Sequence, residues 1–474
     1  MLIRRFSSLP VAVQHSAIYA AALAFSKGLS LIMVPVATHY LTPEDYGRLD
    51  VLQTLADLLS IVIGMGLAET LFRFAGAEND TDARAKAAAN IFGLALLLGA
   101  LALLVTQLLA PLIATTLPGN IAIIETRLIL ASLSLVGTIL VPLAWLRMQG
   151  NPWRYFMGTA GRVALQVGIA IPMLVLGFGV TGVLMATLFS AIALSSWLIW
   201  QQYQATGIRF DFGQFKAYSA YGGPLIFVGM AGFVLGSFDR WILAGSVGTA
   251  EMAQYALAAK FGLMTAILIQ PFDLWWHARR FSCLKEINGE QRCAQYASAG
   301  VAIGLFSALL IAAIGPTLVR LMTPADYHAS IQYIPWLAAL AALHNATSTL
   351  GFGSMSQNNT VRPALIDGTA ALIALIGYLL LIPLFAAWGA IGATAIALTC
   401  RVVATYIISQ RALPLPYPER HLLGLTALTL LCLSFMPSEP LSSTTFATAT
   451  ALLVVYSLVA VGLVLHFKRA PQTE

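Results

Sequence analysis

Ionisable side chains that lie inside long apolar stretches are the residues of this sequence best placed to do chemistry. A charged side chain at the centre of a bilayer costs about 2.5–3.5 kcal/mol on insertion scales, so each needs a partner or a water-filled cavity. Lys27 and Lys260 lie well inside apolar runs, with no opposite charge one helical turn away. Two interpretations stay open for these bases: an interhelical ion pair with an acid such as Asp57 or Asp239, or a cationic lining for an anionic substrate.

The candidate residues form two groups, according to the chemistry expected of them. Those expected to line a substrate cavity are Lys27, Asp57, Asp239, Arg240, Lys260 and Arg401. Those expected to serve in ion coupling or gating are Glu69, Arg73, Asp273 and Asp367. Glu69 and Arg73 are four residues apart, which places them on one helix face and favours a structural pair. We expect no catalytic residue, no metal site and no cofactor.

The elements that carry these residues must be membrane-spanning helices. Of 474 residues, 59% are hydrophobic and only 10% are charged, and the mean hydropathy is +0.81. A soluble domain has roughly 25% charged residues, which excludes an ordinary soluble protein. A disordered chain has low hydrophobicity and high charge, so that class is excluded as well. Apolar runs of about 20 residues, the length of a spanning helix, recur about fourteen times along the chain. They fall at about 15–38, 49–74, 88–109, 124–146, 156–176, 180–202, 223–245, 252–275, 295–322, 331–354, 364–384, 387–409, 421–436 and 446–466, and only a turn near 386–389 divides the eleventh from the twelfth. We therefore predict an all-α integral membrane protein with about 14 transmembrane helices.

The distribution of basic residues predicts the orientation of these helices. With the N-terminus inside, nineteen of the 26 Lys and Arg residues fall on the inner side, and two, Arg48 and Arg320, fall near outer loops. Such an excess is the positive-inside signal, so both termini are expected in the cytoplasm. The basic residues are thinly scattered, which favours membrane topology over nucleic-acid binding. Four cysteines are too few for a disulfide framework.

The chain is expected to form two six-helix lobes and a terminal helix pair. The predicted parts are an N-terminal lobe at 1–203, a cytoplasmic linker at 204–222, a C-terminal lobe at 223–410, and helices 13–14 with a cytoplasmic tail at 411–474. Weak internal similarity supports the division, because Thr42-Pro43-Glu44 recurs as Thr249-Ala250-Glu251. Ionisable residues concentrate in the first two predicted spans of each half. This distribution predicts a water-filled cavity between the lobes.

Several motifs are better explained by structure than by chemistry. Thr42-Pro43-Glu44-Asp45-Tyr46 and its copy Thr323-Pro324-Ala325-Asp326-Tyr327 have the pattern of a capped helix start, with Thr as N-cap and Pro first. Gly177–Gly182 matches the dinucleotide-binding expression, yet it lies in a turn between two apolar runs and lacks the βαβ context that such a site requires. His277, Cys283 and Cys293 lack the paired spacing of a zinc site.

Two stretches carry a resemblance to a known family. The first is Leu41-Thr42-Pro43-Glu44-Asp45-Tyr46-Gly47. The second runs through Asp239, Arg240, Gly245, Tyr255 and Lys260, with Gln254 where the family usually has Gly. In these stretches, and in the number of its apolar runs, the sequence resembles the bacterial polysaccharide flippases of the Wzx type. Their superfamily also includes the MATE multidrug exporters and the lipid II flippase.

The resemblance implies a V-shaped transporter of two helical lobes in the bacterial inner membrane. It implies movement of an oligosaccharide on an undecaprenyl pyrophosphate carrier to the periplasmic leaflet, with membrane lipids and glycan-assembly machinery as partners and no nucleic acid. Two alternatives remain. One is a MATE-like antiporter of small organic cations driven by protons or sodium, expected to have twelve spans and an acidic cavity. The other is a membrane glycan polymerase, an enzyme, expected to carry a large outer loop.

Overall fold

The computed structural model describes residues 11–64, 66–355 and 361–436, and near the C-terminus residues 448, 450–454 and 456–457. Within these ranges the chain is helical, with two 3-10 segments and no strand. The predicted all-α class is therefore confirmed. Ten helical stretches of the described residues are long and apolar enough to cross a membrane, so the protein is a multi-pass membrane protein.

Helix length alone does not fix the number of spans. Three features bear on the expected fourteen. Helices α14 (Ile334–Leu350) and α17 (Glu419–Ser434), of 17 and 16 residues, are not among the ten stretches. Helix α16 (Val361–Ala412) counts once although it holds two predicted spans. The last predicted run, 446–466, lies mostly outside the described residues. The count of fourteen stays a prediction.

The chain divides into two compact units. One comprises Met1–Phe233 with Gly248–Ala250, and the other comprises Val234–Val247 with Glu251–Glu474. The predicted lobe, linker and tail boundaries, and the predicted V shape, stay predictions.

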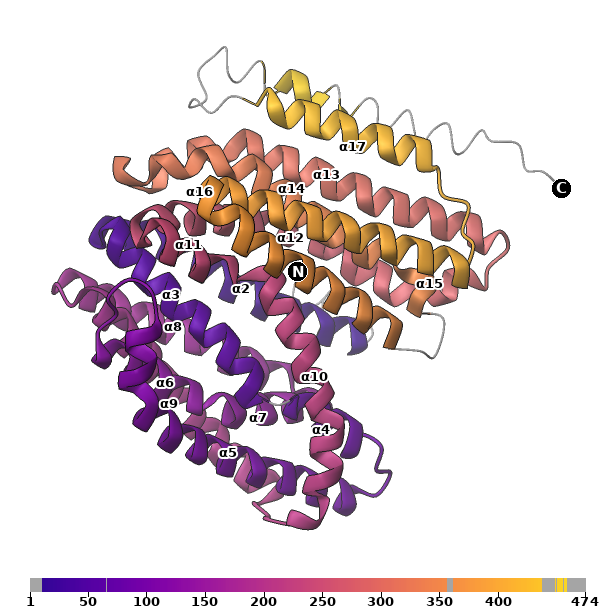
Figure 1. The fold of residues 1–474 in the computed structure, drawn as a ribbon. Coiled ribbons are helices and arrows are strands. Elements are labelled where there is room, and N and C mark those ends of the chain that lie inside the picture. Colours follow the sequence, from indigo (N-terminus) through magenta and orange to yellow (C-terminus); the bar gives the residue numbers. More distant parts are fainter. Residues whose placement is uncertain are drawn as a thin grey trace, which may run out of the picture. The chain divides into compact units, whose positions relative to one another are not determined.

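The first unit is built from helices that follow one another with short connections (Figure 1). They are α2 (Val11–Tyr40), α3 (Pro43–Gly64), α4 (Leu67–Phe74), α5 (Thr81–Thr116), α6 (Ile123–Ser134), α7 (Val136–Met148), α8 (Pro152–Val175), α9 (Gly179–Thr206), the 3-10 turn η1 (Phe212–Gln214) and most of α10 (Phe215–Gly236). Helix α8 packs between α2 and α9, and α5 packs against both α6 and α7.

The second unit has three central helices, α13, α14 and α16, in which α14 packs against both neighbours (Figure 1). Its elements are α11 (Asp239–Val247), most of α12 (Thr249–Leu284), α13 (Gly289–Met322), the 3-10 segment η2 (Ala325–Tyr333), α14, α15 (Phe352–Met355), α16 and α17. Helix α11 packs against α16, and α17 packs against α13.

Apolar side chains occur on the exposed faces of these helices as well as on the faces that pack against other helices. On α5, Leu104, Leu108 and Leu112 follow one another at every fourth position and are 61%, 73% and 61% exposed. A spacing of four places them on one face of the helix. A row of exposed leucines suits lipid and would be unfavourable in water. The opposite side of the same helix holds fully buried residues such as Ile91 and Phe92.

The two Thr-Pro motifs begin different structures. Helix α3 begins at Pro43, and the hydroxyl Oγ1 of Thr42 accepts from the backbone N–H of Asp45 at 3.2 Å, so Thr42 is the predicted N-cap. Thr323 is instead the C-cap of α13, where its hydroxyl donates to the carbonyl of Val319 at 2.8 Å. The prediction for the second motif was wrong on this point, because the preceding helix continues up to Met322 and the next element is a 3-10 segment.

Other turns lie where the sequence predicts them. The segment Gly177–Gly182 spans the turn between α8 and the start of α9, and Gly177 and Gly179 have φ angles of 82° and 54°. Glycine adopts such left-handed angles without steric cost, which explains the repeated glycines without a nucleotide. The apolar run predicted at 49–74 is interrupted at Gly66, whose φ is 59°.

Candidate functional site

The most connected set of predicted residues lies in the second unit, on helices α12, α14 and α16. Arg401 donates from Nε to Oδ1 of Asp367 at 2.7 Å. Its Nη1 lies 3.3 Å from Nδ1 of His344 on α14. Because a guanidinium has donors only, Nδ1 of His344 must act as the acceptor in this contact. The sequence predicted Asp367 and Arg401 as separate candidates, and the structure brings them together.

A sharp break in α16 brings Asp367 and Arg401 together. Ala386 has φ 51° and ψ −130°, so the chain reverses there into two helical arms. Tyr378 and Thr394 share a hydrogen bond of 2.8 Å across the arms. A Cβ added to Gly377 would lie 2.8 Å from that of Ala393, so the arms approach too closely for a larger residue. The predicted division near residues 386–389 is therefore where the helix turns back.

A second polar contact lies next to the first along α14. Asn345, which follows His344 in sequence, donates from Nδ2 to Oδ2 of Asp273 on α12 at 2.5 Å. The other oxygen of Asp273, Oδ1, is buried without a hydrogen-bond partner among the described residues. A buried carboxylate oxygen without a donor is unfavourable while it is ionised. Asp273 is therefore well placed to take up a proton or a small cation.

The two contacts use neighbouring positions of α14 and together hold one guanidinium, one imidazole, one amide and two carboxylates. The residues are Asp273, His344, Asn345, Asp367 and Arg401. With His344 neutral their summed formal charge is negative. The side chains of Arg401 and Asp367 are 15% and 28% exposed, so the pair is neither sealed nor fully solvated. Such an arrangement can bind a cation, exchange a proton, or release Arg401 toward an anion when Asp367 is protonated.

Asp239 holds a separate position in the same unit. It is 5% exposed, and its carboxylate accepts from the hydroxyl of Tyr255 on α12 and from the N–H of Arg240 at 3.0 Å. These contacts join α11 to α12, so Asp239 has a structural role whatever else it does. Arg240 and Lys260 are half-buried and each has an interaction partner.

The predicted residues of the first unit lie on three helices and are all exposed. Lys27 is on α2, Asp57 on α3, and Glu69 and Arg73 on α4. Within the described part of the chain no ion pair joins Glu69 to Arg73, so the structure does not support the pair that their spacing suggested. Their place in the lining of a substrate cavity stays a prediction.

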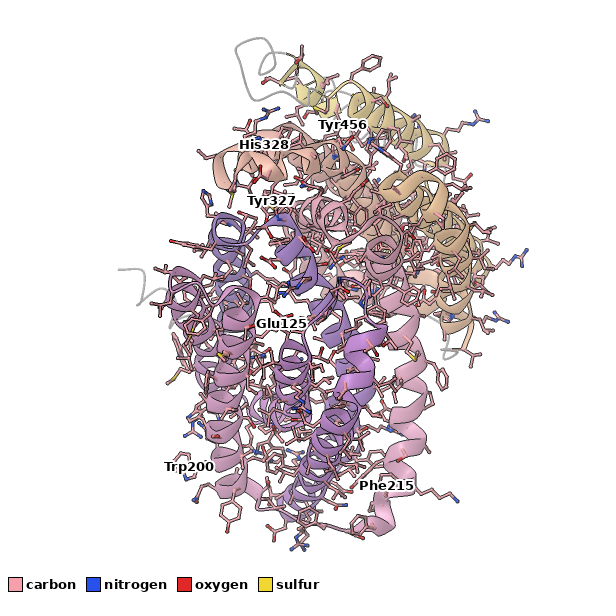
Figure 2. The ribbon with its side chains drawn as sticks, turned by 60° about the vertical axis from the view of Figure 1, so that its left-hand side comes forward. Glu125, Trp200, Phe215, Tyr327, His328 and Tyr456 are labelled. Carbon is pink, nitrogen blue, oxygen red and sulfur yellow. The ribbon has the colours of Figure 1, made fainter. Side chains whose placement is uncertain are left out.

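An ion pair in the first unit was not predicted from the sequence. Arg48 donates from Nη2 to Oε1 of Glu125 at 2.7 Å, and Glu125 is 3% exposed. Oε2 of Glu125 also accepts from the N–H of Ala122 at 3.3 Å, which caps the start of α6. Figure 2 shows Glu125 among the helices of this unit. The only signal in the sequence was an acid in the first turn of an apolar helix.

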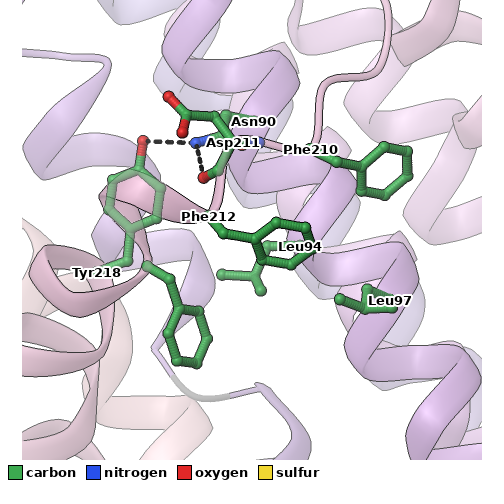
Figure 3. A pocket seen from close by; sticks show the side chains of 8 residues that line it. Asn90, Leu94, Leu97, Phe210, Asp211, Phe212 and Tyr218 are labelled. Atoms are coloured by element: carbon green, nitrogen blue, oxygen red, sulfur yellow. Dashed lines mark hydrogen bonds between the residues drawn. The ribbon is translucent and has the colours of Figure 1, made fainter.

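A shallow recess lies where the segment after α9 returns to α5 (Figure 3). Its lining residues are Asn90, Leu94, Leu97, Phe210, Asp211, Phe212, Phe215 and Tyr218. The side chain of Asn90 accepts from the N–H of Asp211 at 2.7 Å and donates to its carbonyl at 3.1 Å. Gly93 allows this approach, because a Cβ there would collide with the carbonyl of Arg209. The polar groups of the recess serve to dock the segment.

No group of three His, Cys, Asp or Glu residues that could hold a metal ion occurs in the portion that the structure describes. Cys283 and Cys293 are buried, and Cys293 donates from Sγ to the carbonyl of Arg280 at 3.7 Å. These thiols lie where α12 ends and α13 begins.

Comparison with known proteins adds a family and a fold. A family model described as "Polysaccharide biosynthesis protein" matches residues 36–273, half of the 474-residue chain. No curated protein matches. Among solved structures, "Lipid II flippase MurJ, inward closed conformation" is similar, with a TM-score of 0.72, 12% identity, and coverage of 93% of this chain and 98% of that chain.

Two multidrug transporters are similar over most of the chain as well. An inward-facing MATE transporter has a TM-score of 0.57 and 17% identity, covering 83% of this chain and 97% of that chain. The MATE multidrug transporter DinF-BH has a TM-score of 0.58 and 12% identity, covering 85% of this chain and 96% of that chain. At these identities the likeness concerns the fold. The chain has the fold that flippases and multidrug exporters share.

Proposed function

The chain belongs to the polysaccharide biosynthesis protein family, and on this premise we propose that it is a flippase for a lipid-linked oligosaccharide. It moves an oligosaccharide on undecaprenyl pyrophosphate from the cytoplasmic to the periplasmic leaflet by alternating access. Its place is the bacterial inner membrane, with both termini in the cytoplasm. Its partners are the lipid-linked substrate, membrane lipids and the glycan polymerase or assembly machinery that uses the product.

The observation that carries this proposal is the family match over residues 36–273, in a chain built almost wholly of helices in its described part. Polysaccharide assembly needs both glycan-forming enzymes and a step that carries the intermediate across the membrane. A chain of membrane-spanning helices joined by short connections has little room for a separate catalytic domain, which favours transport over polymerisation. The fold shared with the lipid II flippase supports the same choice.

The residues proposed to bind the substrate are those that the sequence singled out. Lys27, Lys260, Arg240 and Arg401 would supply positive charge to the pyrophosphate, with Asp57 and Asp239 as polar partners. Phosphate oxygens accept strong hydrogen bonds from guanidinium and ammonium groups. Within the second unit, the Asp367–Arg401 contact of 2.7 Å suggests a mechanism for exchange, because Arg401 can leave Asp367 for a phosphate. Asp273, Asp367, Glu69 and Arg73 are the proposed coupling or gating residues.

One observation favours the second candidate, a MATE-like antiporter driven by protons or sodium. Asp273 has a buried carboxylate oxygen without a partner among the described residues, and such an oxygen suits a coupling ion. Ion coupling is equally compatible with a flippase. The two functions differ in what accumulates when the protein is absent: a lipid-linked oligosaccharide for the flippase, and an organic cation inside the cell for the antiporter.

The test is a strain that lacks the gene, complemented with the natural chain or with variants. We expect loss of surface polysaccharide and accumulation of lipid-linked oligosaccharide in the inner leaflet, both reversed by the natural chain. Lys27→Ala should restore surface glycan poorly at normal protein abundance, whereas Lys27→Arg should restore it. Gln53→Ala, an exposed polar position on α3, serves as the matched control. A strain with normal surface glycan but raised sensitivity to cationic dyes would contradict the flippase and support the antiporter.

A further inference from the structure

A buried guanidinium near the end of α12 lacks the partner that its charge requires. Arg280 is 9% exposed, and its Nε and Nη1 atoms are buried without a hydrogen-bond partner among the described residues. None of the ion pairs in that part of the chain includes Arg280. An unpaired buried charge is destabilising, and an arginine cannot escape by losing its proton.

Two aromatic rings hold the guanidinium in place. Its central carbon lies 5.7 Å from the ring centre of Phe352 and 5.2 Å from that of Phe281. Cation–π attraction of this kind contributes about 0.5–2 kcal/mol, but it leaves the N–H donors without an oxygen acceptor. Phe352 is fully buried and Phe281 is 46% exposed, so the guanidinium lies just beneath the surface of the second unit.

A second donor without a partner lies one helical turn away. Trp276 is fully buried, and its indole Nε1 has no acceptor among the described residues. Trp276 and Arg280 are four residues apart on α12, which places them on one face. Both side chains contact Phe352, the Trp276 ring at 6.0 Å between ring centres. Two groups that can only donate therefore flank the same phenyl ring, and both lack an acceptor.

The charge of the surrounding sequence favours an anion over a cation. Residues 273–294 carry four Arg or Lys residues against three Asp or Glu residues. Glu286 is already engaged by Arg292 at 2.7 Å. An anion bound from outside the chain would supply the acceptor that Arg280 and Trp276 lack among the described residues.

We infer that Arg280 and Trp276 form a binding site for a phosphate group at the inner end of α12. A guanidinium donates charge-assisted hydrogen bonds to phosphate oxygens, and the indole N–H supplies a further donor. By the predicted topology the site faces the cytoplasm, where a phospholipid headgroup or a free phosphate could supply the group. The inference does not rest on the proposed transport, because it concerns only residues of the second unit and their unmet donors.

The test compares Arg280→Gln and Trp276→Phe with Arg279→Gln, whose exposed side chain lies over Trp275 and carries the same charge. The purified full chain is examined for phosphatidylglycerol retained in native mass spectrometry, with phosphatidylcholine as the neutral reference. In a second arm, inorganic phosphate is titrated while the Tm is followed. We expect Arg280→Gln to weaken binding about tenfold, Trp276→Phe to weaken it less, and Arg279→Gln to leave it within about twofold.

The two arms distinguish the source of the phosphate. Arg280-dependent retention of phosphatidylglycerol assigns the site to a lipid headgroup, and Arg280-dependent stabilisation by inorganic phosphate alone assigns it to a free phosphate. Equal losses in Arg279→Gln and Arg280→Gln, or no Arg280-dependent binding of either probe, would overturn the inference.

Stability without any phosphate gives an independent check. If Arg280 is an unpaired buried charge, Arg280→Gln should be at least as stable as the natural chain in phosphate-free neutral detergent. A marked fall in the Tm of Arg280→Gln under those conditions would mean that Arg280 has a structural partner, and the site would be refuted.

Discussion

Arg401 and Asp367 are thirty-four residues apart and form an ion pair of 2.7 Å across the two arms of α16. The reversal of the chain at Ala386 makes the pair, and His344 on α14 lies 3.3 Å from the same guanidinium. The helical hairpin therefore positions two residues with proposed functions, Arg401 in substrate binding and Asp367 in coupling or gating. It also shows why two candidates that the sequence placed in different roles have to be tested together.

Reversing this ion pair tests whether the two residues act as one unit. Asp367→Ala should lower the free energy of unfolding by about 1–3 kcal/mol, less than for a sealed pair because both side chains are partly exposed. The double variant Asp367→Arg with Arg401→Asp should recover most of that loss. Thermal unfolding in detergent measures the stability, and surface glycan measures transport. If the double variant is no more stable than the less stable of Asp367→Arg and Arg401→Asp alone, the pair does not stabilise the hairpin.

The Arg48–Glu125 pair should matter more for stability. Arg48→Ala leaves a carboxylate that is 3% exposed without its partner, and we expect a loss of about 3–5 kcal/mol and low protein abundance. Asp45→Ala removes the other acid near Arg48, which is 35% exposed and 3.2 Å away, and should change stability by less than about 1 kcal/mol. Similar abundance for the two variants would contradict the assignment of Glu125 as the buried partner.

Protonation of Asp273 can be imitated by substitution. Asp273→Asn should fold with an unchanged or higher Tm, because a neutral amide avoids the desolvation of a buried carboxylate. Transport should fall if Asp273 carries a coupling proton. Asn345→Asp is the matched control, since it places a second carboxylate against Asp273 at the contact of 2.5 Å and should lower the Tm. Were Asp273→Asn clearly less stable than Asn345→Asp, Asp273 would be a structural anion and the coupling role would be lost.

The orientation of the chain can be tested by cysteine labelling in a background where Cys400, the exposed native cysteine, is replaced by serine. Thr81→Cys, at the start of α5, should be shielded from membrane-impermeant thiol reagents in intact cells. Ser443→Cys, outside the described residues, should be labelled, because the predicted loop between the last two helices faces outward. Labelling of both positions, or of Thr81→Cys alone, would refute the topology that the basic residues predict.

Local features of the fold follow from the sequence because they depend on neighbouring residues. The helices follow from apolar runs, the N-cap of α3 from Thr42, and the turn after α8 from Gly177. The break at Ala386 lies at the division predicted between two runs. At Thr323 the same motif failed, because a capping residue serves either the helix that ends or the one that begins, and its own sequence does not decide between them.

Contacts between distant residues could not be predicted in this way. Glu125 is 77 residues from Arg48, and Asp211 is 121 residues from Asn90. Such pairs depend on which helices pack together, and hydropathy marks which residues are apolar without saying which faces meet. The sequence also carried no sign that the donors of Arg280 lack acceptors, because the positive-inside pattern already explains an arginine at the predicted inner end of a helix.

The central claim is outward movement of a lipid-linked oligosaccharide, and reconstituted vesicles test it most directly. Moving one charge through 100 mV is worth about 2.3 kcal/mol, so an inside-negative potential favours outward movement of the anionic pyrophosphate without any ion gradient. The measurement is the fraction of undecaprenyl-pyrophosphate-linked oligosaccharide that becomes accessible on the outer leaflet with the potential imposed and ion gradients absent. We predict that this fraction rises with potential in vesicles that contain the protein, and does not rise in protein-free vesicles. No protein-dependent movement of the lipid under any gradient, together with sodium- or proton-driven export of an organic cation, would contradict the account.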